Sequence, residues 1–373
     1  MNIGLMIYGT LDTISGGYLY DRMIVEHLRK LGNKVEIISL PWRNYFSHLA
    51  DNFSYALCDD IQRRGLDILL QDELNHPSLL LINRRLQRDA KFSIISIVHH
   101  LRGSEAHPAL LQKLYRLVEK QYLNTTDGFI FNSNATRAAV HESVRRLRPS
   151  IIAYPGCDHI RPSITRDSIV RRCMEAGPLR ILFIGNLIRR KRLHTLIDAL
   201  AYLPHQSWRL TVAGSLSADS RYAQHIRQKI TAGRLSDNIE LLGTVAADNL
   251  IPLWERHHCL AVPSSYEGFG IAYLEAMGFG QPVIASTAGG VPEIIRNKEE
   301  GFLVSSGNIN ELALCIDKLA EDRSLLLDIS LAAHKRYCAH HSWEHTAAQV
   351  YDFLCHMVTF KRCSYPGKFP ATQ

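Results

Sequence analysis

The chain has 373 residues, of which 46% are hydrophobic and 21% charged, so it is long enough and apolar enough for two globular domains with buried cores. Its formal net charge of +7 is spread along the chain, with +4 in residues 1–170 and +3 in residues 171–373. This even spread excludes a single basic domain, and because no nucleic-acid motif accompanies it, we expect anionic small molecules or acidic lipid as partners and no nucleic acid.

Short apolar runs alternate with amphipathic segments from the N-terminus onward. The runs predict buried strands, and the helical spacing of apolar residues between them predicts helices. The predicted strands are Ile3–Tyr8, Lys34–Ser39, Ile68–Leu70, Ser93–Val98, Gly128–Asn132 and Ile151–Tyr154. The predicted helices are Tyr20–Leu31, His76–Arg88, Pro108–Leu123 and Asn134–Arg146. This βαβα order predicts a parallel sheet with helices on both faces.

The pattern pauses over residues 161–178, which are polar and flanked by prolines and therefore predict a linker. A second series of strands follows at Leu179–Ile184, Arg209–Ala213, Ile239–Leu242, Cys259–Pro263 and Pro282–Ala285. We therefore expect an α/β protein with two Rossmann-like domains, residues 1–165 and 176–341, facing each other across a cleft that holds the substrates. A last helix, residues 342–360, has Ser342 as its N-cap and is free to pack back on the first domain.

The segment that follows Pro263 carries the strongest chemical signal. A strand ends there, a glycine-bearing turn follows, and a helix opens near Gly270, so its free N–H groups and dipole form an anion site. Gly268 and Gly270 have no Cβ and let a ligand approach the backbone closely. Glu267 and Glu275 offer carboxylates that accept hydroxyl hydrogen bonds, as a sugar and a ribose require. Taken singly, Glu267 is better explained as a partner of the helix dipole and Glu275 as a surface residue, but together with the glycines and the strand–turn–helix context they favour a binding site.

A basic loop follows the first strand of the second half. Arg189, Arg190, Lys191 and Arg192 crowd one strand-to-helix junction, where they would neutralise a pyrophosphate and stabilise a departing nucleoside diphosphate.

These residues resemble a known family. Glu267-Gly-Phe-Gly-Ile-Ala-Tyr-Leu-Glu275 resembles the E-x7-E motif of the family-4 retaining glycosyltransferases, which have the GT-B fold. The resemblance implies that Glu267 contacts the donor sugar, that Gly268, Phe269 and Gly270 meet the sugar and distal phosphate, and that Glu275 binds the nucleotide ribose.

The basic loop fits the same resemblance with one departure. Lys191 matches the family's phosphate-binding lysine, but Asn186 stands where the family usually has an arginine. Arg190 or Arg189 would then supply the missing phosphate contact. Lys191 and Glu267 are accordingly predicted to be catalytic, with Arg190 in the donor site.

Two features of the first half complete the predicted site. Gly16 and Gly17 lie between the first strand and the first helix, where the family carries glycines that approach the donor. His99 ends a strand and resembles a family histidine that hydrogen-bonds the transferred sugar, with His100 as the alternative.

The resemblance implies a retaining, metal-independent hexosyltransferase that uses a nucleoside-diphosphate sugar as substrate and needs no cofactor. The acceptor is left open as a glycan, a lipid or a small molecule, and the donor base and sugar are also open. The alternatives are a non-catalytic nucleotide-sugar-binding protein and a GT-B-type epimerase. The eight cysteines form no CxxC pair, and no apolar run reaches the length of a membrane span, so we expect a cytoplasmic protein, either free or peripheral at the inner membrane face. A role in cell-envelope or polysaccharide synthesis would fit such an enzyme.

Overall fold

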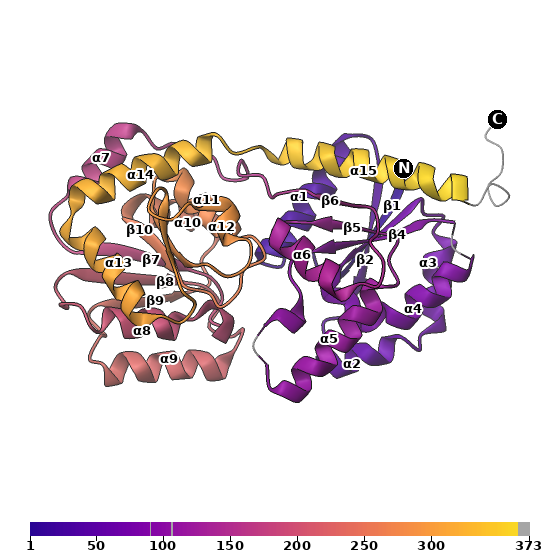
Figure 1. Ribbon diagram of the computed structural model, residues 1–373, viewed down its shortest axis with the longest axis horizontal. Helices are drawn as coiled ribbons and strands as arrows, with labels where there is room; N and C mark the ends of the chain where they lie inside the picture. The colour runs from indigo at the N-terminus through magenta and orange to yellow at the C-terminus, as the bar shows by residue number, and fades with distance from the viewer. Residues whose placement is uncertain (90, 106, 365–373) are drawn as a thin grey trace. The chain divides into compact units, whose positions relative to one another are not determined.

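Two parallel β-sheets of six strands each organise the chain (Figure 1). The computed structural model describes residues 1–89, 91–105 and 107–364. One unit contains Met1–Gly156 together with the segment that begins at His341, and the other contains Cys157–His340. Each unit is an α/β domain with a wholly parallel sheet, which confirms the predicted pair of Rossmann-like folds.

Unit 1 alternates strands and helices as the hydrophobic pattern predicts. Its strands are β1 (Asn2–Tyr8), β2 (Lys34–Leu40), β3 (Ile68–Asp72), β4 (Ser93–Val98), β5 (Gly128–Phe131) and β6 (Ser150–Ile152), in the order β2-β1-β3-β4-β5-β6. Its helices are α1 (Gly16–Lys30), α2 (Tyr45–Asp51), α3 (Tyr55–Arg63), α4 (His76–Asp89), α5 (Ala109–Leu123), α6 (Asn134–Ser143) and α15 (Trp343–Ser364). Helices α2 and α3 were not predicted, because they are short and each begins at a local cap, Asn44 or Ser54.

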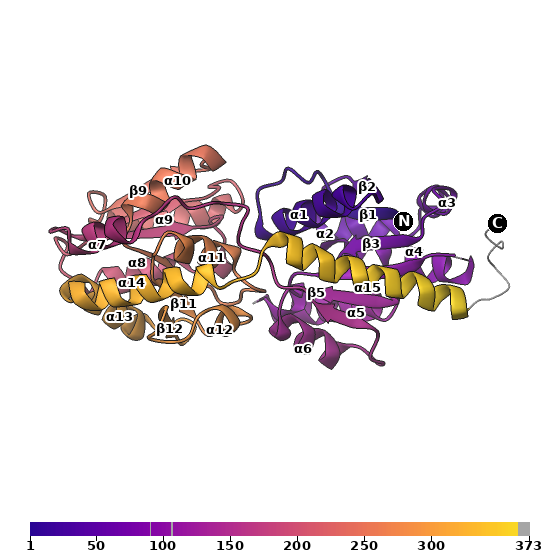
Figure 2. The ribbon, with the colours of Figure 1, turned by 90° about the horizontal axis from the view of Figure 1, so that it is seen from above.

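Helix α15 completes unit 1 although it comes from the end of the chain. It packs on α1 and lies along the sheet near β4 and β6, and Figures 1 and 2 both show it beside α1. Trp343, Val350, Leu354 and Met357 are fully buried in this contact. Figure 1 shows α4 and α5 on the opposite face of the sheet, so the strands are covered on both sides.

Unit 2 repeats this architecture. Its strands are β7 (Leu179–Ile184), β8 (Trp208–Ala213), β9 (Ile239–Gly243), β10 (Cys259–Val262), β11 (Val283–Ser286) and β12 (Gly301–Val304), in the order β12-β11-β10-β7-β8-β9. Its helices are α7 (Arg166–Met174), α8 (Leu193–Leu200), α9 (Ser220–Ala232), α10 (Ala247–Arg256), α11 (Ile271–Gly278), α12 (Val291–Ile294), α13 (Ile309–Glu321) and α14 (Arg323–Cys338).

The predicted linker is wrong over α7. This helix opens with a capping box in which Thr165 and Ser168 satisfy each other's backbone N–H groups. Its Arg172 donates to the carbonyl oxygens of Phe279 and Gly280 at 2.7 and 2.8 Å, which fixes the helix to the domain. The polar composition of the segment concealed this helix, because its buried face consists of only Ile169, Arg172 and Cys173.

Strand order decides which loops meet. In unit 2, β7 and β10 are hydrogen-bonded neighbours, so the loops that follow them emerge side by side at the carboxyl edge of the sheet. In unit 1, β3 lies between β1 and β4, and the loops after these three strands share one edge. Among the described residues no helix is both long and apolar enough to cross a membrane.

Candidate functional site

Glu267 is the centre of a charged cluster in unit 2. It follows β10 and is 7% exposed. Lys191, from the loop after β7, donates to Glu267 Oε1 at 2.5 Å, and Arg190 Nη1 lies 3.3 Å from Oε2. Ser264 Oγ donates to Oε1 at 2.6 Å. The structure thus brings together the two segments that the sequence predicts to form the donor site.

The backbone holds this cluster in place. Arg190 Nη1 donates to the carbonyl oxygen of Tyr266 at 2.7 Å, and the N–H of Ser265 donates to the carbonyl oxygen of Arg190 at 2.7 Å. Glu267 itself forms a parallel bridge with Gly289, and the N–H of Gly290 donates to its carbonyl oxygen at 2.9 Å. These contacts fix the carboxylate between its cations before any ligand arrives.

The electrostatics keep Glu267 ionised. Burial by itself would raise the pKa of its carboxyl group, but the charges of Lys191 and Arg190, with the hydrogen bonds from Lys191 and Ser264, lower it to about 2. Burial also lowers the pKa of Lys191, and Glu267 opposes that effect. Two cations and one carboxylate leave a net positive charge, which suits a bound anion.

Helix α11 begins directly beyond this cluster. Its N-cap, Gly270, has φ +110°, and a Cβ at this position would lie 2.4 Å from the ring of Tyr273. Only glycine therefore fits, and because glycine has no side chain, no cap hydrogen bond from this position covers the N-terminus of the helix. Gly268 and Phe269 are buried in that turn, with Phe269 only 3% exposed.

Glu275 lies in the second turn of α11, away from the lysine cluster. Its Oε1 is 2.8 Å from Nε2 of His159, a residue at the start of unit 2. His159 was assigned no role from the sequence, because no local spacing rule links it to Glu275.

Asn186, which departs from the family pattern, has a structural contact. Its Oδ1 accepts from the N–H of Ser215 at 3.2 Å and so ties the loop after β7 to the loop after β8. Arg190 is directed to Glu267, whereas Arg189 is exposed. Of the two arginines proposed to replace the missing one, Arg190 is the one placed in the charged cluster.

In unit 1 the structure brings Gly17 and His99 together. A Cβ on Gly17 would lie 3.1 Å from Cδ2 of His99, so the glycine lets α1 approach the imidazole. His99 Nε2 lies 3.1 Å from Oδ1 of Asp21, a fully buried residue of α1. Gly16 opens the same helix, and His100 is directed instead to Glu105 at 3.0 Å.

Buried carboxyl groups surround His99. Burial lowers the pKa of its imidazole, but the charge and hydrogen bond of Asp21, with Asp72 and Glu73 nearby, raise it to about 9. The pKa of Asp72 is raised, by burial first and by the charge of Asp21 second. Sequence reasoning missed Asp21 because a single aspartate on an amphipathic helix carries no local signal.

Two groups of side chains in the described part of the chain have metal-ligand spacing, Asp21–Asp72–His99 and Glu73–His76–Glu119. In the second group, His76 Nδ1 lies 3.0 Å from the carbonyl oxygen of Glu73, and its Nε2 lies 3.0 Å from the hydroxyl of Tyr45. Protein hydrogen bonds therefore occupy both ring nitrogens. We assign no ion to either group, and metal-independence stays a prediction.

Comparison with known proteins supports this description of unit 2. The family model described as "Glycosyl transferases group 1" matches residues 174–336. An uncharacterised glycosyltransferase of Methanocaldococcus jannaschii is 32% identical over 46% of this chain and 43% of its own length. A D-inositol 3-phosphate glycosyltransferase of Corynebacterium urealyticum is 26% identical over 69% of this chain and 63% of its own length. The chain therefore spans roughly half to two thirds of these relatives.

Solved structures share the fold over nearly the whole chain. Sucrose-phosphate synthase of Thermosynechococcus elongatus has a TM-score of 0.83 and 21% identity, covering 96% of this chain and 100% of that one. Anabaena HepE, solved with UDP and glucose, has a TM-score of 0.75 and 21% identity, covering 95% of this chain and 99% of that one. Residues 174–336 thus match the group 1 glycosyl transferases, and the chain has the fold of sucrose-phosphate synthase and HepE.

Proposed function

We propose that this chain is a family-4 retaining glycosyltransferase that moves a hexose from a nucleoside-diphosphate sugar to an acceptor. The buried carboxylate of Glu267, held ionised by Lys191 and Arg190 at the turn before α11, carries the proposal. The match of residues 174–336 to glycosyl transferases group 1 supports it, as does the fold shared with HepE, which has been solved with UDP-glucose.

Each member of the cluster has a role in this proposal. Lys191 and Arg190 neutralise the donor diphosphate, together with the open N–H groups of α11. Glu267 accepts hydrogen bonds from the sugar hydroxyls, and Glu275 accepts them from the ribose, with His159 fixing its carboxylate. In unit 1, His99 donates to the transferred sugar, and Asp21 holds its ring in position.

The anomeric configuration of the donor sugar is retained if the acceptor attacks the same face of the sugar from which the nucleoside diphosphate departs. The acceptor oxygen forms a bond to the anomeric carbon while the bond from that carbon to the diphosphate oxygen breaks. The acceptor proton moves to the departing phosphate oxygen, and the charge of Lys191 and Arg190 stabilises the leaving nucleoside diphosphate. A double displacement would require an enzymic nucleophile, and both glutamates are already assigned to binding.

The site is tested with Lys191→Ala and Glu267→Gln, assayed for donor turnover. Each change should lower turnover by about 100-fold or more, because each removes charge stabilisation from the reacting diphosphate or sugar. Lys229→Ala is the matched control: Lys229 pairs with Asp198 at 2.5 Å in the same unit, outside the cluster. Circular dichroism would verify folding, since each substitution leaves a charged partner uncompensated. Near-normal turnover in a folded Glu267→Gln protein would refute the assignment.

A thermal-shift screen with uridine and guanosine diphosphates and their sugars would identify the donor. A nucleotide that binds only the folded state raises the melting temperature, and the shift grows with the ratio of the nucleotide concentration to its Kd. Binding without turnover of any donor would indicate a non-catalytic nucleotide-sugar-binding protein, and alteration of the sugar without an acceptor would indicate an epimerase.

A further inference from the structure

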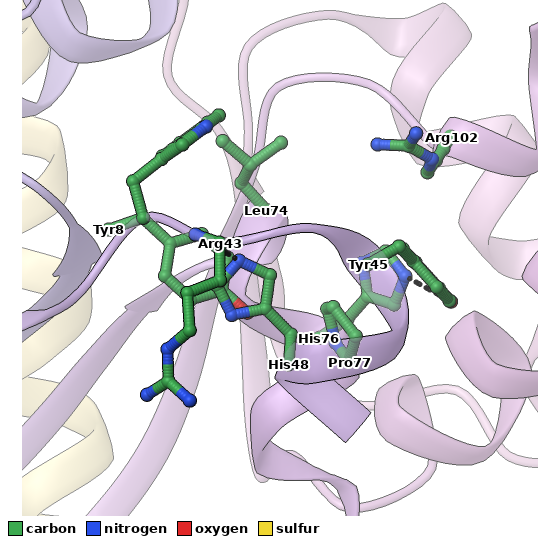
Figure 3. Close-up of a pocket in the computed structure, with 9 residues that line it drawn as sticks. Tyr8, Arg43, Tyr45, His48, Leu74, His76, Pro77 and Arg102 are labelled. Carbon is green, nitrogen blue, oxygen red and sulfur yellow. Dashed lines mark hydrogen bonds between the residues drawn. The ribbon is translucent and has the colours of Figure 1, made fainter. Parts of the chain in front are cut away.

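A hollow lies wholly within unit 1, at the carboxyl edge of its sheet (Figure 3). Tyr8 ends β1, Leu74 and His76 follow β3, and Arg102 follows β4. This is the same edge that carries Gly17 and His99. In open parallel sheets this edge is where ligands bind.

Aromatic rings form one wall of the hollow. His48 stacks on Tyr8 with 3.9 Å between ring centroids, and Trp42 meets Tyr8 edge-on at 5.6 Å. Trp42 is 63% exposed, whereas Trp208, Trp254 and Trp343 are fully buried. An exposed indole beside a hollow that is lined by aromatic rings and an arginine offers an amphipathic face on which a hydroxyl-bearing ring can pack.

Positive charge forms the other wall. Figure 3 shows Arg102 on the far side of the hollow from Tyr8 and Arg43. The guanidinium of Arg102 lies over the rings of Tyr45 and Tyr115, at 5.3 and 4.8 Å from their centroids. Its buried Nε has no hydrogen-bond partner, and within the described ranges no carboxylate forms an ion pair with it.

The neighbouring titratable groups oppose this charge only in part at neutral pH. Arg43 is paired with Asp51 at 3.1 Å, so it adds little net charge. Burial lowers the pKa of His76 to about 4 and keeps the imidazole neutral. Burial raises the pKa of Glu73 to about 7, and it does the same for Glu119, whose carboxylate accepts from the N–H of Gly103 beside Arg102. Each carboxyl group is therefore only partly ionised at neutral pH and offsets part of the arginine charge.

We infer that this hollow binds the acceptor, and that the acceptor carries a phosphate or carboxylate group beside a hydroxyl-bearing ring. The inference rests on the proposed glycosyl transfer and names the chemical class of its second substrate. The cavity of about 50 Å³ takes the anionic group, which pairs with the planar fork of Arg102, while the ring packs on Trp42 at the rim. Such a group belongs either to a free sugar or polyol derivative or to a lipid headgroup.

Fluorescence of Trp42 gives a direct binding test on the full-length protein. Titration with a hexose phosphate should change the emission of the exposed tryptophan and protect it from acrylamide quenching, whereas the parent hexose should do neither. Trp42→Phe should remove the signal, because the other three tryptophans are buried. Equal responses to hexose and hexose phosphate would overturn the inference.

Substitutions at Arg102 test whether its positive charge binds the anionic group of the ligand. Arg102→Gln should weaken binding of the hexose phosphate by about tenfold or more, because a charge-assisted bond is lost, and Arg102→Lys should retain part of the affinity. Arg137→Gln, at an exposed arginine of the same unit, is the matched control and should bind as the wild type does. If Arg102 served only the packing of Tyr45 and Tyr115, both Arg102 variants would lose thermal stability while binding the hexose phosphate as the wild type does, and the inference would fail.

Transfer assays separate this inference from the proposed function. The wild type, with its donor, is given a neutral hexose, a hexose phosphate, a hexuronic acid, or vesicles of a lipid with an anionic polyol headgroup. Transfer to either free anion or to the vesicles supports the inference and identifies the source. Transfer to the neutral hexose alone overturns it. Absence of donor binding would refute the proposed function, while the fluorescence titration would still decide whether the hollow binds an anion.

Discussion

Glu267 and Asp72 show how neighbours decide the charge of a buried side chain. Burial raises the pKa of both carboxyl groups. At Glu267 two cations and a serine hydroxyl outweigh burial, so the carboxylate stays ionised, whereas at Asp72 the carboxylate of Asp21 adds to the effect of burial. The protonation states of the two candidate groups are therefore set by contacts and cannot be inferred from residue type.

His99 should make stability depend on pH. Its pKa of about 9 in the folded protein exceeds the value near 6.5 of an unfolded chain, so its contribution is complete below about pH 6.5 and is lost as the pH rises through about 9. The contribution is on the order of a few kcal/mol, because the folded and unfolded protein bind the proton of this imidazole with different affinity. In urea unfolding at pH 7 and 8.5, the urea concentration at the midpoint of the transition should be lower at the higher pH.

The His99→Gln substitution should reduce the loss of folding stability between pH 7 and 8.5. Comparing the variant with the wild type at each pH cancels the contributions of the buried cysteines and tyrosines, whose pKa values are also raised. An unchanged slope in the variant would show that His99 is not the titrating group.

At the scale of elements, the candidate site residues of both units lie at strand-to-helix junctions. The loop after β7 and the turn between β10 and α11 meet because their strands are paired. The turn leads into a helix whose first N–H groups face it, and Gly270 makes the sharp entry to α11 possible. The geometry of this one residue therefore determines where the helix N-terminus lies relative to Glu267.

Gly270→Ala should destabilise the protein and weaken nucleotide binding. Alanine would have to adopt φ +110° and would also place its Cβ 2.4 Å from Tyr273. Gly177→Ala is the matched control, since Gly177 has φ +119° with no atom within 4 Å of the added Cβ. The control should cost about 1–2 kcal/mol of backbone strain, and Gly270→Ala should cost more. Equal losses of melting temperature in the two variants would show that the contact with Tyr273 has no effect.

At the scale of the whole molecule, sequence order and spatial order differ. The chain builds most of unit 1, then all of unit 2, and returns at His341 to finish unit 1 with α15. Leu354, in α15, is fully buried, so the C-terminal residues contribute to the stability of the N-terminal domain.

Leu354→Ala should therefore destabilise unit 1 by about 2–5 kcal/mol, the usual cost of such a cavity. Hydrogen exchange should become faster in α1, β4 and β6 while protection in β7 and β10 is retained. Leu319→Ala, at an equally buried leucine of α13 in unit 2, should give the reverse pattern. Faster exchange throughout the chain in both variants would show that the two units unfold together.

The sequence by itself determined the strands, most of the helices and the glycine-rich turn with its two glutamates, because hydrophobic period and turn chemistry are local properties of the chain. It did not reveal α7, which buries only three side chains in a polar segment, or the short helices α2 and α3. Only the tertiary structure paired Glu267 with Lys191, 76 residues away, Glu275 with His159, 116 residues away, and His99 with Asp21. These contacts depend on which strands are neighbours in the sheets and on how the intervening chain folds, and neither is encoded in the local period of apolar residues.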